Sequence, residues 1–244
     1  MFELTNKVAI VTGATSGIGK AVARAYVKMG AKVAFIARDT TKLADIEKEF
    51  GDAAVAVSCD VTDEASVTSM VALVIKKWGR IDIAVCNAGI VSLAKLSDMP
   101  LEEFERIQKT NVTGVFLVAR TCAKAMKPGG SIITTASMSG HVVNTPQDIG
   151  HYCTSKGAVL MLTKALAIEL APRNIRVNSI SPGYIMTELV EPLTDYHAIW
   201  KPRIPLGRLG KPDELTGLFI YLASDASGYM TGSDLIIDGG YTAI

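Results

Sequence analysis

Short, continuously apolar segments alternate with longer helical stretches along the chain, and this alternation constrains the fold more than any other feature. Strands exposed on one face alternate apolar and polar residues. These segments stay apolar throughout, which is typical of a parallel sheet covered on both faces. Strands that alternate with helices form right-handed βαβ units. We therefore expect an α/β fold with a doubly wound, seven-stranded parallel sheet and helices on both faces. The expected strands are residues 7–11, 32–37, 53–58, 81–86, 131–136, 175–180 and 235–238.

The organisation of the chain predicts one domain over residues 1–244. Its length suits a single α/β domain, and no internal repeat or low-complexity linker divides it. Residues 184–211 depart from the alternation of strands and helices, because they contain three prolines and no clear strand. A long insertion of this kind is usually a lid or binding loop, so we expect a lid there, with a plain surface excursion as the alternative. Helices are expected at 18–29, 102–125, 152–170 and 212–222. Two more are expected, one after the second strand that ends at about residue 50, and one that residues 61–63 open and that runs to 78.

Charge and composition exclude several classes of partner. The chain carries 25 Lys and Arg against 24 Asp and Glu, a net charge of +1, so no overall field attracts nucleic acid or an anionic membrane. No apolar run approaches the roughly 18 residues of a membrane span. The N-terminus lacks the segments of a signal peptide, so a cytoplasmic protein is expected. The scattered cysteines are expected to be free thiols without a metal site: Cys59, Cys86, Cys122 and Cys153.

A glycine-rich turn, TGATSGIG, joins the first expected strand to the first expected helix. Gly13, Gly17 and Gly19 allow the backbone to turn tightly and to approach a pyrophosphate, and the helix N-terminus supplies unpaired N–H groups and a positive dipole end. A purely structural turn is the alternative interpretation. Its place between strand and helix favours a nucleotide site, so we expect a Rossmann-type sheet.

Tyr152 and Lys156 lie four residues apart on an expected helix and therefore share a face. A free phenol has a pKa of about 10. A neighbouring ammonium favours the phenolate and lowers that pKa, which suits proton transfer to or from a hydroxyl. Elsewhere such a pair is usually solvated, but here it follows the fifth strand, where the crevice of such sheets opens. We therefore expect an acid/base pair.

Two serines on the loop that leaves the fifth strand are candidates to hold a substrate oxygen. Ser139 lies thirteen residues before Tyr152, and this spacing favours it over Ser137. Ordinary loop polarity is the alternative for both residues.

The chain resembles the short-chain dehydrogenase/reductase family, because its glycine turn and further motifs follow in the order of the family's TGxxxGIG, NAG, S…YxxxK and PG elements. The resemblance implies catalysis by Asn111, Ser139, Tyr152 and Lys156. It also implies that Asn111 holds a water beside Lys156 for proton relay, and that Asp60 meets an adenine. The implied cofactor-binding residues are Gly13, Thr15, Ser16, Gly17, Ile18, Gly19, Arg38, Asp60, Val61, Asn87, Ala88, Gly89, Tyr152, Lys156, Pro182, Gly183, Ile185 and Thr187.

The end of the second strand predicts the choice between NAD and NADP. An NAD site usually places an acid there for the ribose 2′-OH, whereas an NADP site brings an arginine to the 2′-phosphate. The acid position falls on Ala37, and Arg38 follows it. We therefore expect NADP(H), with the site resting on Arg38 because the family's other basic position is Ser16. A shift of one residue would offer Asp39 to the ribose instead.

Residues 136–147, ASMSGHVVNTPQ, resemble fungal and bacterial polyol dehydrogenases and ketose reductases, including those for mannitol, sorbose and xylulose. The resemblance implies a small carbonyl or alcohol substrate, a ketose/polyol pair. His151 and Cys153 depart from the residues that usually flank the tyrosine, so the particular sugar stays open. The expected substrate residues are His141, Asn144, Gln147, Leu189 and Trp200.

Two other functions remain open at this point. The apolar side chains of the expected lid also suit an acyl chain, so a 3-oxoacyl carrier-protein reductase or general ketone reductase is the first alternative. A non-catalytic nucleotide sensor is the second. The family resemblance further implies a homotetramer that uses the helices at 102–125 and 152–170.

Overall fold

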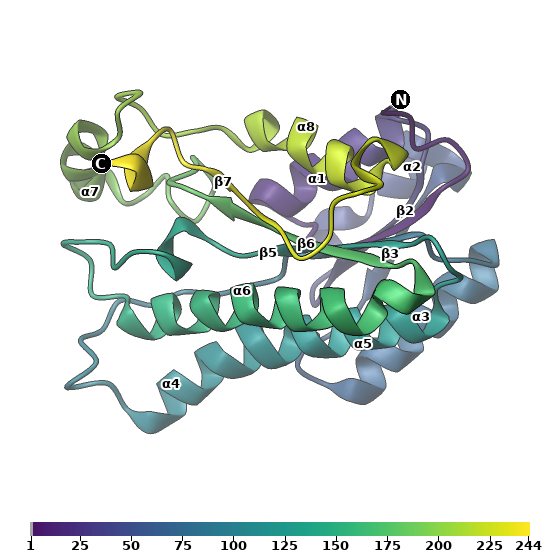
Figure 1. Ribbon diagram of the computed structural model, residues 1–244, viewed down its shortest axis with the longest axis horizontal. Helices are drawn as coiled ribbons and strands as arrows, with labels where there is room; N and C mark the ends of the chain where they lie inside the picture. The colour runs from purple at the N-terminus through teal and green to yellow at the C-terminus, as the bar shows by residue number, and fades with distance from the viewer. Residues whose placement is uncertain (1) are drawn as a thin grey trace.

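A seven-stranded parallel sheet forms the centre of the computed structural model, which describes residues 2–244 (Figure 1). The strand order is β3-β2-β1-β4-β5-β6-β7, and each neighbouring pair runs parallel. The expected doubly wound parallel sheet is therefore confirmed. The strands are β1 (Val8–Thr12), β2 (Lys32–Ala37), β3 (Ala54–Ser58), β4 (Ile83–Cys86), β5 (Ser131–Thr135), β6 (Arg176–Pro182) and β7 (Asp234–Ile237).

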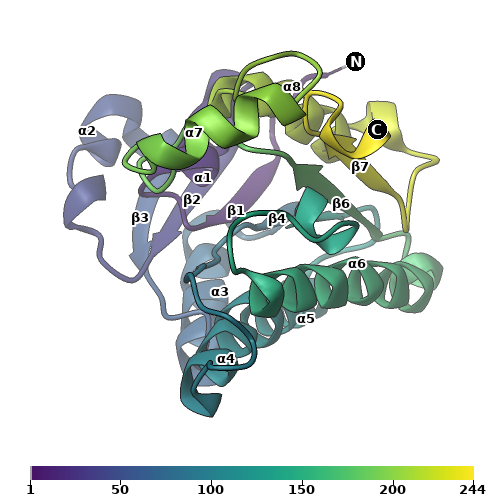
Figure 2. The same ribbon diagram turned by 90° about the vertical axis from the view of Figure 1, so that its left-hand side faces the viewer.

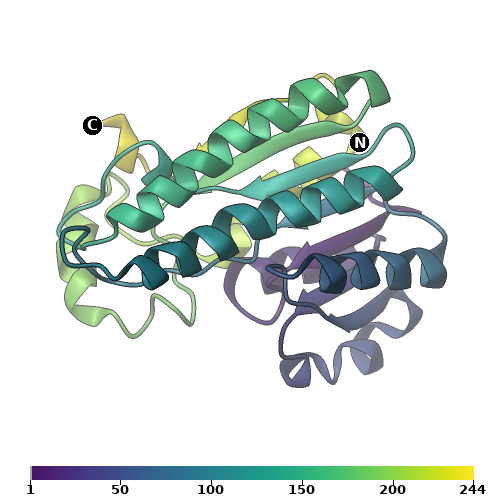
Figure 3. The ribbon, with the colours of Figure 1, turned by 90° about the horizontal axis from the view of Figure 1, so that it is seen from below.

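Helices cover both faces of the sheet (Figure 2). The strands β1 and β4 are buried and apolar except for Thr12, whereas β5 and β6 are buried but also carry polar residues. On the other side of the sheet from α1, the helix α5 packs between α3 and α6 (Figure 3). The first face is covered by α1 (Gly17–Lys28), α2 (Ile46–Phe50) and α8 (Pro212–Ala223). The second face is covered by α3 (Glu64–Trp78), α5 (Gly114–Ala125) and α6 (Gly150–Leu170), and α4 (Leu101–Gln108) packs against α6.

The helix expected at 102–125 is interrupted, so that expectation was wrong in one respect. A π-helical turn, Lys109–Thr113, separates α4 from α5. It contains the buried Asn111, whose side-chain oxygen accepts from the Ile90 N–H at 2.8 Å while its amide donates to the Ile90 carbonyl at 2.9 Å. Single π turns occur frequently at functional sites. This turn brings Asn111 against the loop that follows β4.

The segment expected as a lid contains a short helix, α7 (Thr194–Trp200), and a small apolar core of its own. Trp200, Ile204 and Leu209 form that core, and the ring of Tyr184 stacks on Trp200 with centroids 4.1 Å apart. The segment lies beyond the carboxyl ends of the strands (Figure 1).

The strand order reverses between β1 and β4, and open α/β sheets bind ligands at such a point. The Thr12 hydroxyl joins the ends of these two strands, because it donates to the Val85 carbonyl and accepts from the Asn87 and Ala88 N–H groups. Among residues 2–244, no helix is long and apolar enough to cross a membrane. The same residues contain no cluster of three or more His, Cys, Asp or Glu side chains suited to a metal ion.

Candidate active site

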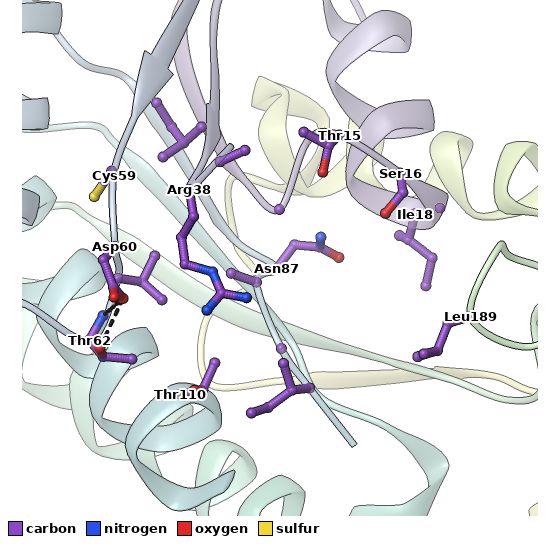
Figure 4. Close-up of a pocket in the computed structure, with 18 of the residues that line it drawn as sticks. Thr15, Ser16, Ile18, Arg38, Cys59, Asp60, Thr62, Asn87, Thr110 and Leu189 are labelled. Atoms are coloured by element: carbon purple, nitrogen blue, oxygen red, sulfur yellow. Dashed lines mark hydrogen bonds between the residues drawn. The ribbon is translucent and has the colours of Figure 1, made fainter. Parts of the chain in front are cut away.

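A cleft of about 600 Å³ opens at this reversal point, at the carboxyl ends of the central strands (Figure 4). The glycine turn, the end of β2, the residues after β3 and β4, and the segment after β6 line it. This cleft brings together most of the residues expected to bind a cofactor. Those lining it are Gly13, Thr15, Ser16, Gly17, Ile18, Arg38, Asp60, Val61, Asn87, Ala88, Gly89 and Thr187.

The glycine turn has the geometry of a phosphate cradle. Gly13 and Gly17 adopt positive φ angles of 68° and 51°, which favour glycine. A Cβ at Gly19 would lie 2.2 Å from the Gly13 carbonyl oxygen, so no side chain fits there. The Ser16 side chain does not cap α1, and the first turn of α1 carries no acidic residue. The donors and the helix dipole therefore fit the pyrophosphate of a dinucleotide.

Arg38 and Asp39 differ in the direction that they face. Arg38 lines the cleft (Figure 4). Its guanidinium makes no hydrogen bond or ion pair with residues 2–244. Asp39 instead accepts from the backbone N–H and the hydroxyl of Thr41 at 2.9 and 2.7 Å, and it does not line the cleft. The Arg38 guanidinium, and not the Asp39 carboxylate, is thus available to a ligand in the cleft at the end of β2.

Asp60 lies at the opposite wall of the cleft from the glycine turn (Figure 4). The backbone N–H and the hydroxyl of Thr62 both donate to one of its oxygens, at 2.9 and 2.8 Å. These hydrogen bonds hold the pKa of the Asp60 carboxyl below its usual value, with smaller lowering by Arg38 and Lys109. Asp60 is therefore an ionised acceptor at neutral pH.

A second cavity of about 180 Å³ adjoins the cleft and contains Tyr152 and Lys156. It shares Ile18, Asn87, Gly89 and Thr187 with the first cleft, so the two form one continuous site. Pro182, Gly183, Ile185 and Leu189 also line it, as expected. A molecule bound in the cleft would therefore reach the Tyr-Lys pair.

The ionisation of the Tyr-Lys pair differs from the expectation. Burial raises the pKa of Tyr152 to about 12, against a smaller lowering by a hydrogen bond with Ser137. Burial also lowers the pKa of Lys156 to about 8. The Lys156 ammonium donates to the Thr135 carbonyl at 2.7 Å and lies 5.5 Å from the centroid of the Tyr152 ring. Burial therefore moves the phenol pKa in the direction opposite to the lowering that we expected from the ammonium.

Ser137, and not Ser139, faces the Tyr152 phenol. Ser137 lines the cavity and hydrogen-bonds Tyr152. The Ser139 hydroxyl instead donates to the Asn144 side-chain oxygen at 2.5 Å, and Ser139 does not line the cavity. The geometry thus favours Ser137, the rival candidate, over Ser139 as the serine that reaches the cavity. The sequence signal for Ser137 was its position two residues after β5, which places Ser137 nearer the edge of the sheet than Ser139.

His141 and Asn144 do not line the cavity that they were expected to line. The His141 ring nitrogen lies 2.8 Å from a carboxylate oxygen of Asp234, at the start of β7. Asn144 is buried and holds Ser139. Both side chains thus help to position the loop that carries Ser137.

Gln147 and Trp200 were also expected at the substrate, and both are buried instead. The Gln147 amide donates to the Tyr184 hydroxyl at 2.5 Å, and its oxygen accepts from the Trp200 indole N–H at 3.0 Å. Arg203 adds a hydrogen bond to the Thr145 hydroxyl at 2.7 Å. The three contacts fasten α7 and its neighbours to the loop after β5. Sequence reasoning missed Tyr184 and Arg203 in this role.

The side chains of Asn111 and Lys156 both lie next to Gly89. A Cβ at Gly89 would lie 3.3 Å from the Asn111 oxygen and 3.7 Å from the Lys156 ammonium. The Asn111 amide also donates to the Ser155 hydroxyl at 3.0 Å. The structure thus brings Asn111, Tyr152 and Lys156 to one place. The water that the resemblance assigns to Asn111 stays a prediction.

The sheet, the glycine cradle and the Tyr-Lys cavity define a dinucleotide-binding protein with an acid/base site. Comparison with known proteins agrees with this class. A family described as enoyl-(acyl carrier protein) reductase matches residues 13–242. The chain belongs to the short-chain dehydrogenase/reductase family, as its motifs predicted.

Individual relatives match over nearly the whole chain. A probable NADP-dependent mannitol dehydrogenase of Yarrowia lipolytica is 42% identical, covering 98% of this chain and 89% of the relative. A sorbose reductase of Candida albicans is 40% identical, covering 99% and 89%. The crystal structure of a short-chain type dehydrogenase/reductase from Mycobacterium marinum is 60% identical, with a TM-score of 0.97 and coverage of 100% and 98%.

Proposed function

We propose that the protein is an NADP(H)-dependent oxidoreductase that interconverts a ketose and a polyol. The observation that carries the proposal is the continuity of the dinucleotide cleft with the cavity that holds Tyr152, Lys156 and Ser137. The bound nicotinamide would supply or accept the hydride. The chain itself positions the carbonyl carbon and handles the proton on the oxygen.

Each catalytic side chain has a separate task. Ser137 donates a hydrogen bond to the substrate oxygen and fixes its position. Tyr152 donates its proton to that oxygen during reduction, and a phenol with a pKa of about 12 is protonated at neutral pH as this step requires. Lys156, near the phenol, stabilises the phenolate that remains. Asn111 would hold a water beside Lys156, and that water would relay the proton towards solvent.

Preference for NADP(H) follows from Arg38. Its guanidinium lines the cleft without an internal partner, and a guanidinium pairs with a phosphate through charge-assisted hydrogen bonds. Asp39, the residue that would serve NAD, binds Thr41. The name of the Yarrowia relative agrees with this choice.

The ketose/polyol assignment rests on the names of the two curated relatives and on the small cavity, about 180 Å³. Residues 184–211 form the substrate lid, with the exposed Leu189 at the mouth of the cavity. A 3-oxoacyl carrier-protein reductase is the second candidate. The apolar Leu189 and Val190 at the cavity favour it.

Oxidation of NADPH with a panel of ketones tests the proposal. Turnover with ketohexoses, and none with a 3-oxoacyl thioester, is the expected result. The reverse selectivity would support the second candidate. Tight NADPH binding without turnover on any ketone would indicate a nucleotide sensor.

We further propose that the chain forms a cytoplasmic homotetramer, in keeping with its family. Exposed apolar side chains on α5 and α6 supply one suitable face, including Phe116, Met161 and Ile168. Phe2 and Ile236, beside α8 and on β7, supply another. Light scattering during gel filtration measures the mass directly, and a monomer at micromolar concentration would contradict the assembly.

A further inference from the structure

A carboxylate from the lid lies on the phosphate cradle. The backbone N–H of Gly17, the first residue of α1, donates to a Glu188 carboxylate oxygen at 2.9 Å. The two residues are 171 positions apart in the sequence. Glu188 also lines the dinucleotide cleft, next to the glycine turn. The contact therefore joins the lid to the part of the cleft that fits a pyrophosphate.

The packing around this contact is tight. A Cβ at Gly17 would lie 3.0 Å from the Thr187 methyl group, so the backbone of the turn and the lid meet directly. Ser16 does not cap the helix, and the first turn of α1 has no acidic residue of its own. Glu188 thus supplies the negative charge that a helix N-terminus favours.

The carboxylate and a pyrophosphate compete for the same group. A backbone N–H carries one proton, and it cannot make a full hydrogen bond to two anions. Two negative groups beside one helix N-terminus also repel each other. A pyrophosphate seated at the N-terminus of α1 must therefore displace Glu188.

The part of the lid that this displacement moves is limited. Trp200 and Arg203 fasten α7 and the turn after it to Gln147 and Thr145. Val190 is tied to the rest of the lid, because it packs on the Trp200 core and its carbonyl oxygen lies 2.9 Å from a His197 ring nitrogen. Residues 187–189 are held by the turn that they begin and by the Glu188 contact. Leu189, in this strip, is 60% exposed and reaches both cavities.

We propose that Glu188 competes with the dinucleotide pyrophosphate for the N-terminus of α1, weakens cofactor binding and links it to movement of residues 187–189. This inference rests on the proposed function, because it requires a dinucleotide in the cleft. It assigns to a lid residue a role in cofactor affinity and release.

Equilibrium titration with NADPH, followed by its fluorescence, tests the proposal in Glu188→Gln. The amide keeps the size of the side chain and removes its charge. We expect the variant to bind NADPH roughly two- to fivefold more tightly, since charges at exposed helix N-termini have effects of this size. The gain should shrink at high salt, where the repulsion is screened. Glu191→Gln is the matched control, because it removes an exposed charge three residues away and should leave the dissociation constant unchanged.

The outcomes separate this inference from the proposed function. If the wild-type protein binds no NADPH, the cofactor assignment is wrong. If the wild-type protein binds NADPH and Glu188→Gln binds it equally or more weakly, the competition is refuted while the cofactor assignment stands. Equal tightening by Glu191→Gln would also refute it, because the effect would then be one of general charge. A second readout is the amide exchange rate of Gly17 without NADPH, which should rise in Glu188→Gln.

Discussion

Replacement of Arg38 by leucine should weaken NADPH binding with little effect on stability. The guanidinium is exposed in the cleft and makes no hydrogen bond or ion pair with residues 2–244, so its removal leaves no internal partner unsatisfied. The change should therefore appear almost entirely in the affinity for the 2′-phosphate.

The magnitude follows from the kind of interaction. A hydrogen bond to a charged group contributes roughly 1.5–3 kcal/mol, or about one to two decades in affinity. Because Arg38 is exposed, we expect the lower end, about a tenfold rise in the dissociation constant of NADPH. NADH lacks the phosphate, so its dissociation constant should stay nearly constant. Parallel fluorescence titrations with both cofactors measure the ratio.

The double change Ala37→Asp with Arg38→Leu should reverse the preference. The new carboxylate would accept from the ribose hydroxyl and repel the 2′-phosphate. Asp39→Ala is the control, because Asp39 binds Thr41 and should contribute nothing to NADH binding. A wild-type preference for NADH that Asp39→Ala abolishes would refute the reasoning and make Asp39 the ribose ligand.

Further predictions concern the catalytic cavity and the lid. Ser137→Ala should lower kcat about 100-fold, as loss of one transition-state donor does, and Ser139→Ala much less; the opposite ranking would restore Ser139. Tyr152→Phe should lower turnover by about two to four decades and leave the NADPH dissociation constant nearly unchanged. Alcohol oxidation should accelerate as pH rises towards the Tyr152 pKa of about 12, whereas ketone reduction should fall above the Lys156 pKa of about 8, where the ammonium loses its proton; pH profiles in both directions check this. Gln147→Leu should raise KM for the ketose and lower Tm while NADPH affinity holds, and an unchanged KM would contradict its role in positioning the lid.

The sheet was predictable because strands that are buried on both faces tend to be runs of apolar residues, which the sequence displays. Each expected strand has an observed counterpart whose ends differ by no more than two residues, as for 7–11 against Val8–Thr12. The π turn at Lys109–Thr113 was not predictable from local pattern. It depends on the bonds between Asn111 and Ile90, which exist only in the folded chain.

The candidate site also contains some features that the sequence predicts and others that it does not. Backbone-determined features, such as the glycine cradle and the Tyr152–Lys156 spacing, could be recognised from the sequence. The directions of loop side chains could not, because they depend on which buried partners the fold provides. Gln147 faces Trp200 and Ser139 faces Asn144 for this reason. The pKa of Tyr152 likewise depends on burial that no spacing reveals.

Deuterium transfer from the cofactor to the product would report hydride transfer and its dependence on Tyr152. The protein is incubated with a ketohexose and NADPH that carries deuterium at the transferable position of the nicotinamide, and the product is examined by mass spectrometry and NMR. We expect a polyol with deuterium on the former carbonyl carbon from the wild-type protein, and almost none from Tyr152→Phe. A polyol without deuterium, or undiminished labelling with Tyr152→Phe, would contradict this expectation.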